Sequence, residues 1–171
     1  MLIHNISQLI TLTERPQSGT ELGTLNVIED GAVLLRDENI AEVGSGVDLL
    51  ARYPDEKRLD ASGCAVLPGF VDPHTHLVWA GDRAAEFEMR LQGKTYMEIM
   101  AAGGGIASTV KATRSALLEE LRMQTSQRAE RLIRHGTTTA EAKTGYGLEL
   151  GAELRQMQVL LELDKAGPLE I

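Results

Sequence analysis

The sequence predicts an α/β fold: the start of a (β/α)8 TIM-type barrel, preceded by a small β-rich segment. Three observations predict it. The first 62 residues contain short strand-like runs and turns, later residues alternate between strand and helix patterns, and an apolar strand ends in His74 and His76. Strands that alternate with helices are typical of a parallel sheet covered by helices. We therefore expect a β-rich segment at 1–62 and the first two to three β/α units of a barrel at 63–171.

The N-terminal segment contains several short apolar runs but no group of residues suited to catalysis. Strand-like runs occupy 2–3, 9–12, 25–28, 32–35 and 40–44. The run Glu29-Asp30-Gly31 predicts a turn between two of them. Residues 47–52 predict at most a short helix. We expect this segment to be a small β-structure.

The second segment is made of longer alternating elements. They are a strand at 66–71, a short helix near 96–102 ended by the glycines 103–105, an amphipathic helix from about 115 to 134, a β-branched strand at 137–142, a helix from 150 to about 166, and the start of a third strand at 169–171. A complete eight-fold barrel takes about 250 residues. We therefore expect the barrel to be incomplete in this chain.

His74 and His76 form the feature most suggestive of chemistry. Residues i and i+2 of a strand point to the same face, so the two imidazoles are aimed at one point, as a metal ion requires. Pro73 cannot donate to a sheet ladder, and we expect it to mark the end of the strand. A His-x-His pair also occurs by chance. Its place after a buried strand, where barrels carry their active sites, favours a catalytic metal.

Composition narrows the classes of partner. The net charge of −8 argues against nucleic acid and against an anionic membrane, because both require a basic surface. Hydrophobic content of 43% and charged content of 25% are those of a globular protein. No run is long enough to span a membrane, and the N-terminus lacks the basic region of a signal peptide. The single cysteine, Cys64, fits a reducing compartment, so we expect a cytoplasmic protein.

Several motifs resemble a known group of enzymes. The run Leu-Pro-Gly-Phe-Val-Asp-Pro-His-Thr-His at 67–76, after runs at 32–35, 40–44 and 59–63, resembles the opening of the amidohydrolase superfamily of metal-dependent hydrolases. In that superfamily a β-segment precedes a metal-bearing barrel. Further runs at 91–100, 102–106, 111–114 and 135–148 are similar to the imidazolonepropionase family within it. The resemblance spans the whole chain but lacks the second half of that family.

The resemblance implies a reaction and a set of site residues. His74 and His76 would be two ligands of one divalent or trivalent metal ion, zinc or iron. Arg83 would bind the substrate carboxylate, and Tyr146 and Tyr96 would contact the substrate. The reaction implied is hydrolytic opening of the small anionic 4-imidazolone-5-propanoate to N-formimidoyl-L-glutamate in histidine degradation, by an enzyme that is a possible homodimer when complete. No catalytic acid or base can be identified.

Each assignment has a simpler alternative. Arg83 could pair with Asp82 or Glu86 on the surface, the glycines beside Tyr146 would also suit an ordinary turn, and Tyr96 on a helix is more often a core residue. The chain could instead belong to another amidohydrolase, such as a cyclic amidase or a nucleobase aminohydrolase. It could also be a non-catalytic fragment, because two histidines alone hold a metal weakly.

Overall fold

The computed structural model describes residues 1–12 and 15–171, which form two compact units, 1–68 and 69–171. The units meet later in the chain than the expected boundary at residue 62, because the short strand β5 (Ala65–Val66) pairs with β1 of the first unit. Within the described residues, no helix is long and apolar enough to cross a membrane.

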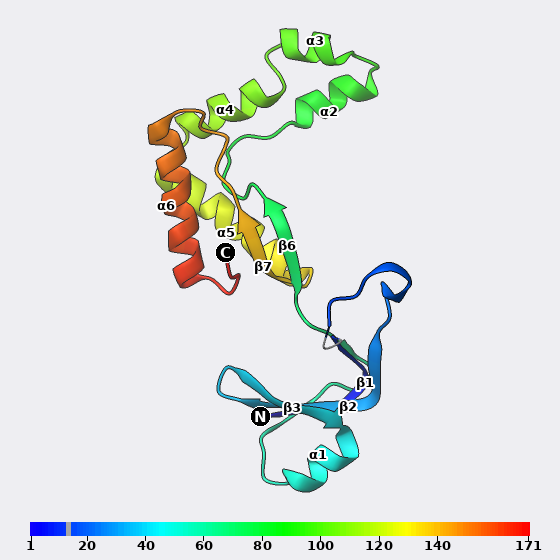
Figure 1. The fold of residues 1–171 in the computed structure, drawn as a ribbon. Helices are drawn as coiled ribbons and strands as arrows, with labels where there is room; N and C mark the ends of the chain where they lie inside the picture. Colours follow the sequence, from blue (N-terminus) through cyan, green and yellow to red (C-terminus); the bar gives the residue numbers. More distant parts are fainter. Residues whose placement is uncertain (13–14) are drawn as a thin grey trace. The chain divides into compact units, whose positions relative to one another are not determined.

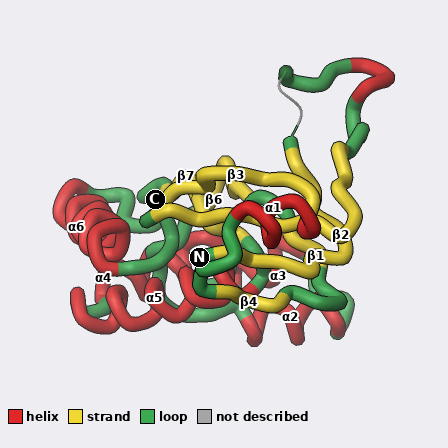
Figure 2. Tube along the Cα trace, turned by 90° about the horizontal axis from the view of Figure 1, so that it is seen from below, coloured by secondary structure: helices red, strands yellow, loops and turns green. Residues whose placement is uncertain are grey.

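The first unit is a five-stranded sheet with one helix on it (Figures 1 and 2). Besides β5, its elements are β1 (Leu2–Thr11), the 3-10 turn η1 (Gly19–Glu21), β2 (Asn26–Arg36), β3 (Asn39–Ser45), α1 (Gly46–Arg52) and β4 (Arg58–Asp60). The strand order is β3-β2-β1-β4, with β5 also beside β1. Strands β1, β2 and β3 pair antiparallel, whereas β4 and β5 run parallel to β1.

The turn predicted at 29–31 is wrong, because β2 runs straight through it. Asp30 has a left-handed φ of 50°, and the β1–β2 register shifts between Ile3 and Ile6, opposite this point. A Cβ on Gly31 would lie 2.8 Å from Cβ of Leu9. Asp30 and Gly31 therefore form an irregularity within the long β1–β2 pair, and Gly31 lets the two strands approach closely. Besides turns, sheets use such residues at bulges and close backbone contacts.

Both faces of this sheet bury apolar side chains. Leu49 of α1 packs with Leu2 and Leu34 on one face. Ile6, Leu9 and Val33 form a second cluster. The predicted strand at 40–44 and short helix at 47–52 are confirmed as β3 and α1.

The second unit has two parallel strands covered by helices. Its elements are β6 (Phe70–Thr75), α2 (Ala84–Leu91), α3 (Tyr96–Ala101), α4 (Ile106–Ser115), α5 (Leu118–Arg134), β7 (Thr137–Ala142) and α6 (Leu150–Ala166). Strands β6 and β7 point the same way, and α2, α3 and α4 lie beyond their carboxyl ends (Figure 1). On the other side of β7, Glu170 bridges Thr139 in parallel, as the start of a third strand predicts.

Two helix predictions need correction. The helix expected from about 115 to 134 is α5 alone, since Ser115 instead ends α4, where its hydroxyl donates to the Lys111 carbonyl at 2.9 Å. The sequence pattern predicts no helix at α2. It is only eight residues long, which is shorter than the stretch over which helical periodicity is recognised in a sequence, and its large apolar residues Phe87 and Leu91 are 64% and 74% exposed.

The strand predicted at 66–71 is also wrong. Strand β5 ends at Val66, three residues without regular secondary structure follow, and the next strand, β6, starts at Phe70. Pro73 lies inside β6 rather than at its end, at a point where the register with β7 is interrupted between Asp72 and Thr75, so its missing N–H costs no ladder bond. Phe70 and Val71 were expected to be buried, yet they are 54% and 65% exposed.

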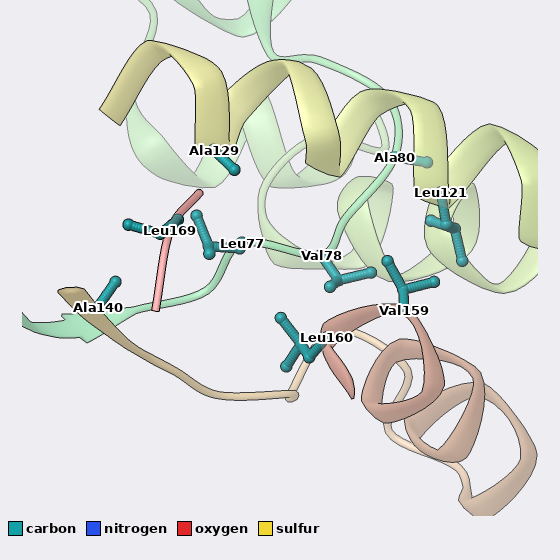
Figure 3. Close-up of a cluster of buried hydrophobic side chains, with 9 residues drawn as sticks. All are labelled: Leu77, Val78, Ala80, Leu121, Ala129, Ala140, Val159, Leu160 and Leu169. Atoms are coloured by element: carbon teal, nitrogen blue, oxygen red, sulfur yellow. The ribbon is translucent and has the colours of Figure 1, made fainter. Parts of the chain in front are cut away.

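The core of the second unit joins α5 and α6 to the strands and to the segment after β6 (Figure 3). Leu121 and Ala129 come from α5, and Val159 and Leu160 from α6. They pack around Val78, which is fully buried. This cluster fixes the backbone just beyond the histidine pair.

Candidate metal and substrate site

His74 and His76 lie at the carboxyl end of β6. Their ring centroids are 5.7 Å apart, with the rings edge-on at 74°. His74 is exposed and His76 is half-buried. The Lys143 ammonium nitrogen lies 3.4 Å from Nδ1 of His74. The strand therefore brings the two imidazoles close together, as their spacing predicts.

His76 is closely surrounded on one side. A Cβ on Gly145, whose φ is 140°, would lie 3.1 Å from Cε1 of His76, so glycine lets the loop backbone approach the ring. The Tyr146 ring centroid is 5.1 Å from that of His76. Nδ1 of His76 is buried and has no hydrogen-bond partner among the described residues. An unpaired buried nitrogen is costly, which makes this imidazole a suitable ligand for a group that would satisfy it.

The loop that carries Tyr146 follows β7 and is held by helix α6. The Gly147 and Leu148 N–H groups both donate to Oε1 of Glu153 at 2.7 Å. Burial raises the pKa of Glu153, but hydrogen bonds from the Thr144 hydroxyl and the loop N–H groups outweigh it and hold that pKa below its ordinary value. The first turn of α6 thus fixes the position of Tyr146.

Arg83 lies just before α2 and is partly paired. Its Nε donates to Oγ1 of Thr109 at 3.1 Å and lies 3.9 Å from Oε1 of Glu86. Glu86, only 7% exposed, also accepts the Gly105 N–H at 2.7 Å, which ties the glycine-rich run to α2. Asp82 accepts the Ala84 N–H at 2.9 Å. The ion pair between Arg83 and Glu86 that the alternative interpretation predicts is thus present, but its N–O distance is long. The Arg83 side chain remains 42% exposed.

Arg83 and Tyr146 line the same cavity. Its volume is about 420 Å³, and its walls are Trp79, Asp82, Arg83, Thr109 and Tyr146. Tyr96, in contrast, is 61% exposed on α3 and is not among these lining residues. Sequence reasoning did not select Trp79. The available signal was its place three residues after His76.

Comparison with known proteins shows the family. A profile described as "Amidohydrolase family" matches residues 57–144, which is more than half of the chain. The chain belongs to the amidohydrolase family. A second profile, "Imidazolonepropionase-like composite domain, bacteria", matches residues 31–55 of this amidohydrolase.

Curated relatives cover the whole chain, but the chain covers less than half of each. It is 49% identical over 173 residues to the imidazolonepropionase of Chloroflexus aggregans, spanning 100% of this chain and 40% of that protein. The imidazolonepropionase of Brevibacillus brevis is 49% identical over 176 residues, which cover 99% of this chain and 42% of that protein. This amidohydrolase thus spans about 40% of the length of these curated relatives.

Solved structures show the same fold. Guanine deaminase of E. coli matches with a TM-score of 0.63 at 22% identity, covering 96% of this chain and 34% of that one. Guanine deaminase from Bradyrhizobium japonicum matches with a TM-score of 0.60 at 20% identity, covering 96% and 32%. The predicted fold class, an α/β barrel opening preceded by a β-rich segment, is confirmed.

Proposed function

We propose that this chain is the N-terminal portion of an imidazolonepropionase-type hydrolase. The proposed reaction opens 4-imidazolone-5-propanoate to N-formimidoyl-L-glutamate in histidine degradation. The observation that carries the proposal is the shared cavity of Arg83 and Tyr146, with the His76 ring 5.1 Å from that of Tyr146. The identity of 49% to imidazolonepropionases along the whole chain supports the same reaction.

Arg83 would bind the propanoate group. A guanidinium offers a planar fork of donors that matches a carboxylate, and among residues 1–12 and 15–171 the one hydrogen bond of the Arg83 side chain is from Nε to Thr109. Tyr146 would supply a phenolic donor to the same substrate from the loop that follows β7. The cavity volume of about 420 Å³ lies in the range of small-molecule sites, roughly 300–1,000 Å³.

The histidine pair fits a metal ion as far as two ligands go. His74 and His76 present adjacent imidazoles, and Nδ1 of His76 is buried without a partner. Among residues 1–12 and 15–171 there is no group of three or more histidine, cysteine or acidic side chains that could hold a metal. A zinc or iron ion bound there would act as a Lewis acid for hydrolysis of the ring amide. The further ligands would come from polypeptide that the longer relatives possess.

The chemistry consumes one water. Its oxygen bonds to the ring carbonyl carbon, the bond from that carbon to the ring nitrogen breaks, and the departing nitrogen takes a proton. This yields the carboxylate and the formimidoyl-amine of the product. Arg83 and Tyr146 would hold the substrate in place for this step, which lowers its barrier by fixing the orientation.

Further parts of the proposal follow from the family resemblance. Tyr96 would be a second substrate contact, although it lies outside the lining of the cavity. The enzyme would be cytoplasmic, a possible homodimer when complete, and would bind neither nucleic acid nor membranes. The net charge of −8 supports the last point.

The test is a chimera in which this chain replaces the matching 40% of the Chloroflexus aggregans relative. We expect the chimera to turn over imidazolonepropanoate. Its His74→Ala variant should lose both this turnover and the bound metal. Turnover of a nucleobase or of dihydroorotate, without turnover of imidazolonepropanoate, would instead support another amidohydrolase activity. A metal-loaded chimera that hydrolyses none of these would refute the proposal and favour a non-catalytic fragment.

A further inference from the structure

Trp79 is the only tryptophan of the chain, and neither the metal pair nor the carboxylate contact explains it. It lies between Val78 and Ala80, which are 0% and 3% exposed and belong to the core cluster (Figure 3). Its own side chain is only half-buried, and it lines the cavity of Arg83 and Tyr146. The backbone is therefore fixed by the core while the indole is presented to the cavity.

Arg128 of α5 holds this indole from one side. Its guanidinium carbon lies 3.6 Å from the indole centroid, a close cation–π stack. Nη1 of Arg128 donates to the Leu77 carbonyl at 2.9 Å, and Nη2 donates to Oε1 of Gln124 at 3.1 Å. Burial, helped by the nearby Arg131, lowers the pKa of Arg128 to about 10, which still leaves it charged at neutral pH.

The consequence is a rigid aromatic wall. Arg128 occupies one face of the indole, so the cavity is lined by the surface that Arg128 leaves free. A fixed aromatic surface recognises flat rings by stacking or edge contact, and it loses little side-chain entropy when it binds them. Arg83, which lines the same cavity, offers a guanidinium to a carboxylate. A flat heterocycle with a short acidic arm matches both.

We propose that Trp79 binds the planar ring of the substrate while Arg83 binds its carboxylate, and that Arg128 is the positioning residue that holds Trp79. This assignment deepens the proposed function and rests on it. It makes Trp79 a determinant of specificity for a ring, which an acid-binding arginine alone cannot provide.

The experiment uses the 171-residue chain and imidazolepropionate, a stable flat-ring acid. Its dissociation constant is measured by calorimetry, and Trp79 emission is followed in parallel under excitation that tyrosine does not absorb. We expect binding to change the Trp79 emission, and Trp79→Leu to weaken binding by about 3- to 10-fold, the size of a lost aromatic contact. Trp79→Phe, which keeps a flat ring, should weaken it less. Phe87→Leu is the matched control, since Phe87 is 64% exposed and outside the cavity lining.

Arg128 is tested by the same two readouts. Arg128→Leu should change the emission of Trp79 in the free protein and weaken the binding of imidazolepropionate. Arg128→Lys, which keeps the charge, should restore part of both. A structural role alone would leave the affinity of a correctly folded Arg128→Leu variant unchanged.

The outcomes separate this inference from the proposed function. If imidazolepropionate binds the wild type and Trp79→Leu equally, the Trp79 assignment is overturned, while a loss of binding in Arg83→Ala would still support the proposed carboxylate site. If the wild-type chain binds no imidazolepropionate and its emission does not change, the Trp79 assignment is overturned for this chain, and the turnover of the chimera decides the proposed function by itself. A weakened Trp79→Leu with an unchanged Phe87→Leu supports the assignment.

Discussion

The carboxylate of Glu153 should be the main anchor of the loop that carries Tyr146. It accepts two backbone N–H groups, from Gly147 and Leu148, at 2.7 Å each, and Gly147 is buried. Hydrogen bonds to a charged group are worth about 1.5–3 kcal/mol each. Glu153→Ala removes both and leaves a buried donor unpaired, so we expect the free energy of unfolding to fall by about 3 kcal/mol. Glu153→Gln keeps an acceptor and should cost about 1 kcal/mol.

The effect of Glu153 should depend on pH. Burial raises its pKa, but the hydrogen bonds from Thr144 and the loop lower that pKa by more than burial raises it. The folded-state pKa therefore lies below the ordinary value. A carboxylate with a depressed folded-state pKa stabilises the protein above the unfolded-state pKa, about 4.3, and the stabilisation is lost as pH falls through the folded-state value. The difference between wild type and Glu153→Gln should therefore be present at neutral pH and disappear in acid.

The assay is urea unfolding followed by circular dichroism, at neutral pH and at a series of acidic values. Glu149→Gln is the matched control, because its 51% exposed side chain pairs with Arg114 at 3.6 Å and should contribute within about 0.5 kcal/mol. Equal stability of Glu153→Gln and wild type at every pH would refute the anchoring role.

Three further predictions concern the core and the site. Leu160→Ala should lower the free energy of unfolding by about 2–5 kcal/mol because Leu160 is 4% exposed, whereas Leu161→Ala, at 55% exposed, should change it by at most about 0.5 kcal/mol in the same urea titration. In the chimera, Arg83→Lys should raise KM for imidazolonepropanoate by about 10-fold because it loses the bidentate fork, and an unchanged KM would contradict the carboxylate role. His76→Ala should abolish stoichiometric zinc or iron in the chimera by elemental analysis, and retained metal would contradict its assignment as a ligand.

Sequence patterns predicted the second unit best where one element has one clear signal. The β-branched run 137–142 and the helix 150–166 are observed with the predicted bounds, since a helix pattern bounded by Gly167-Pro168 admits few alternatives. Helix α2 was not predicted because its eight residues are too few for a helical period to stand out in the sequence. The turn signal at 29–31 failed because residues that tolerate a left-handed backbone serve a strand irregularity as readily as a turn.

The site was only partly accessible from sequence. The spacing of His74 and His76 predicts two imidazoles on one face, because strand periodicity is a local property. Arg83 and Tyr146 were selected by family resemblance, and their shared cavity depends on contacts between segments far apart in the chain. The only sequence signal for Trp79 is its place three residues after His76, which does not reveal its role, since that role depends on Arg128 stacking from another element. Local patterns do not encode such partnerships.

The parallel pairing of β6 and β7 explains why distant residues meet at this edge. Thr75 pairs with Ala142, and the Lys143 N–H donates to the Thr75 carbonyl at 2.8 Å, so both strands end at the same level. Whatever follows each strand is then delivered to one place: His76 after β6 and Tyr146 after β7. Glu170 forms an isolated parallel bridge with Thr139 of β7, so a strand that continued from it would carry the residues after it to the same edge. Because each parallel strand adds its following loop to one rim, further ligands for the proposed metal site at His74 and His76 would be expected at the carboxyl ends of strands parallel to β6 and β7.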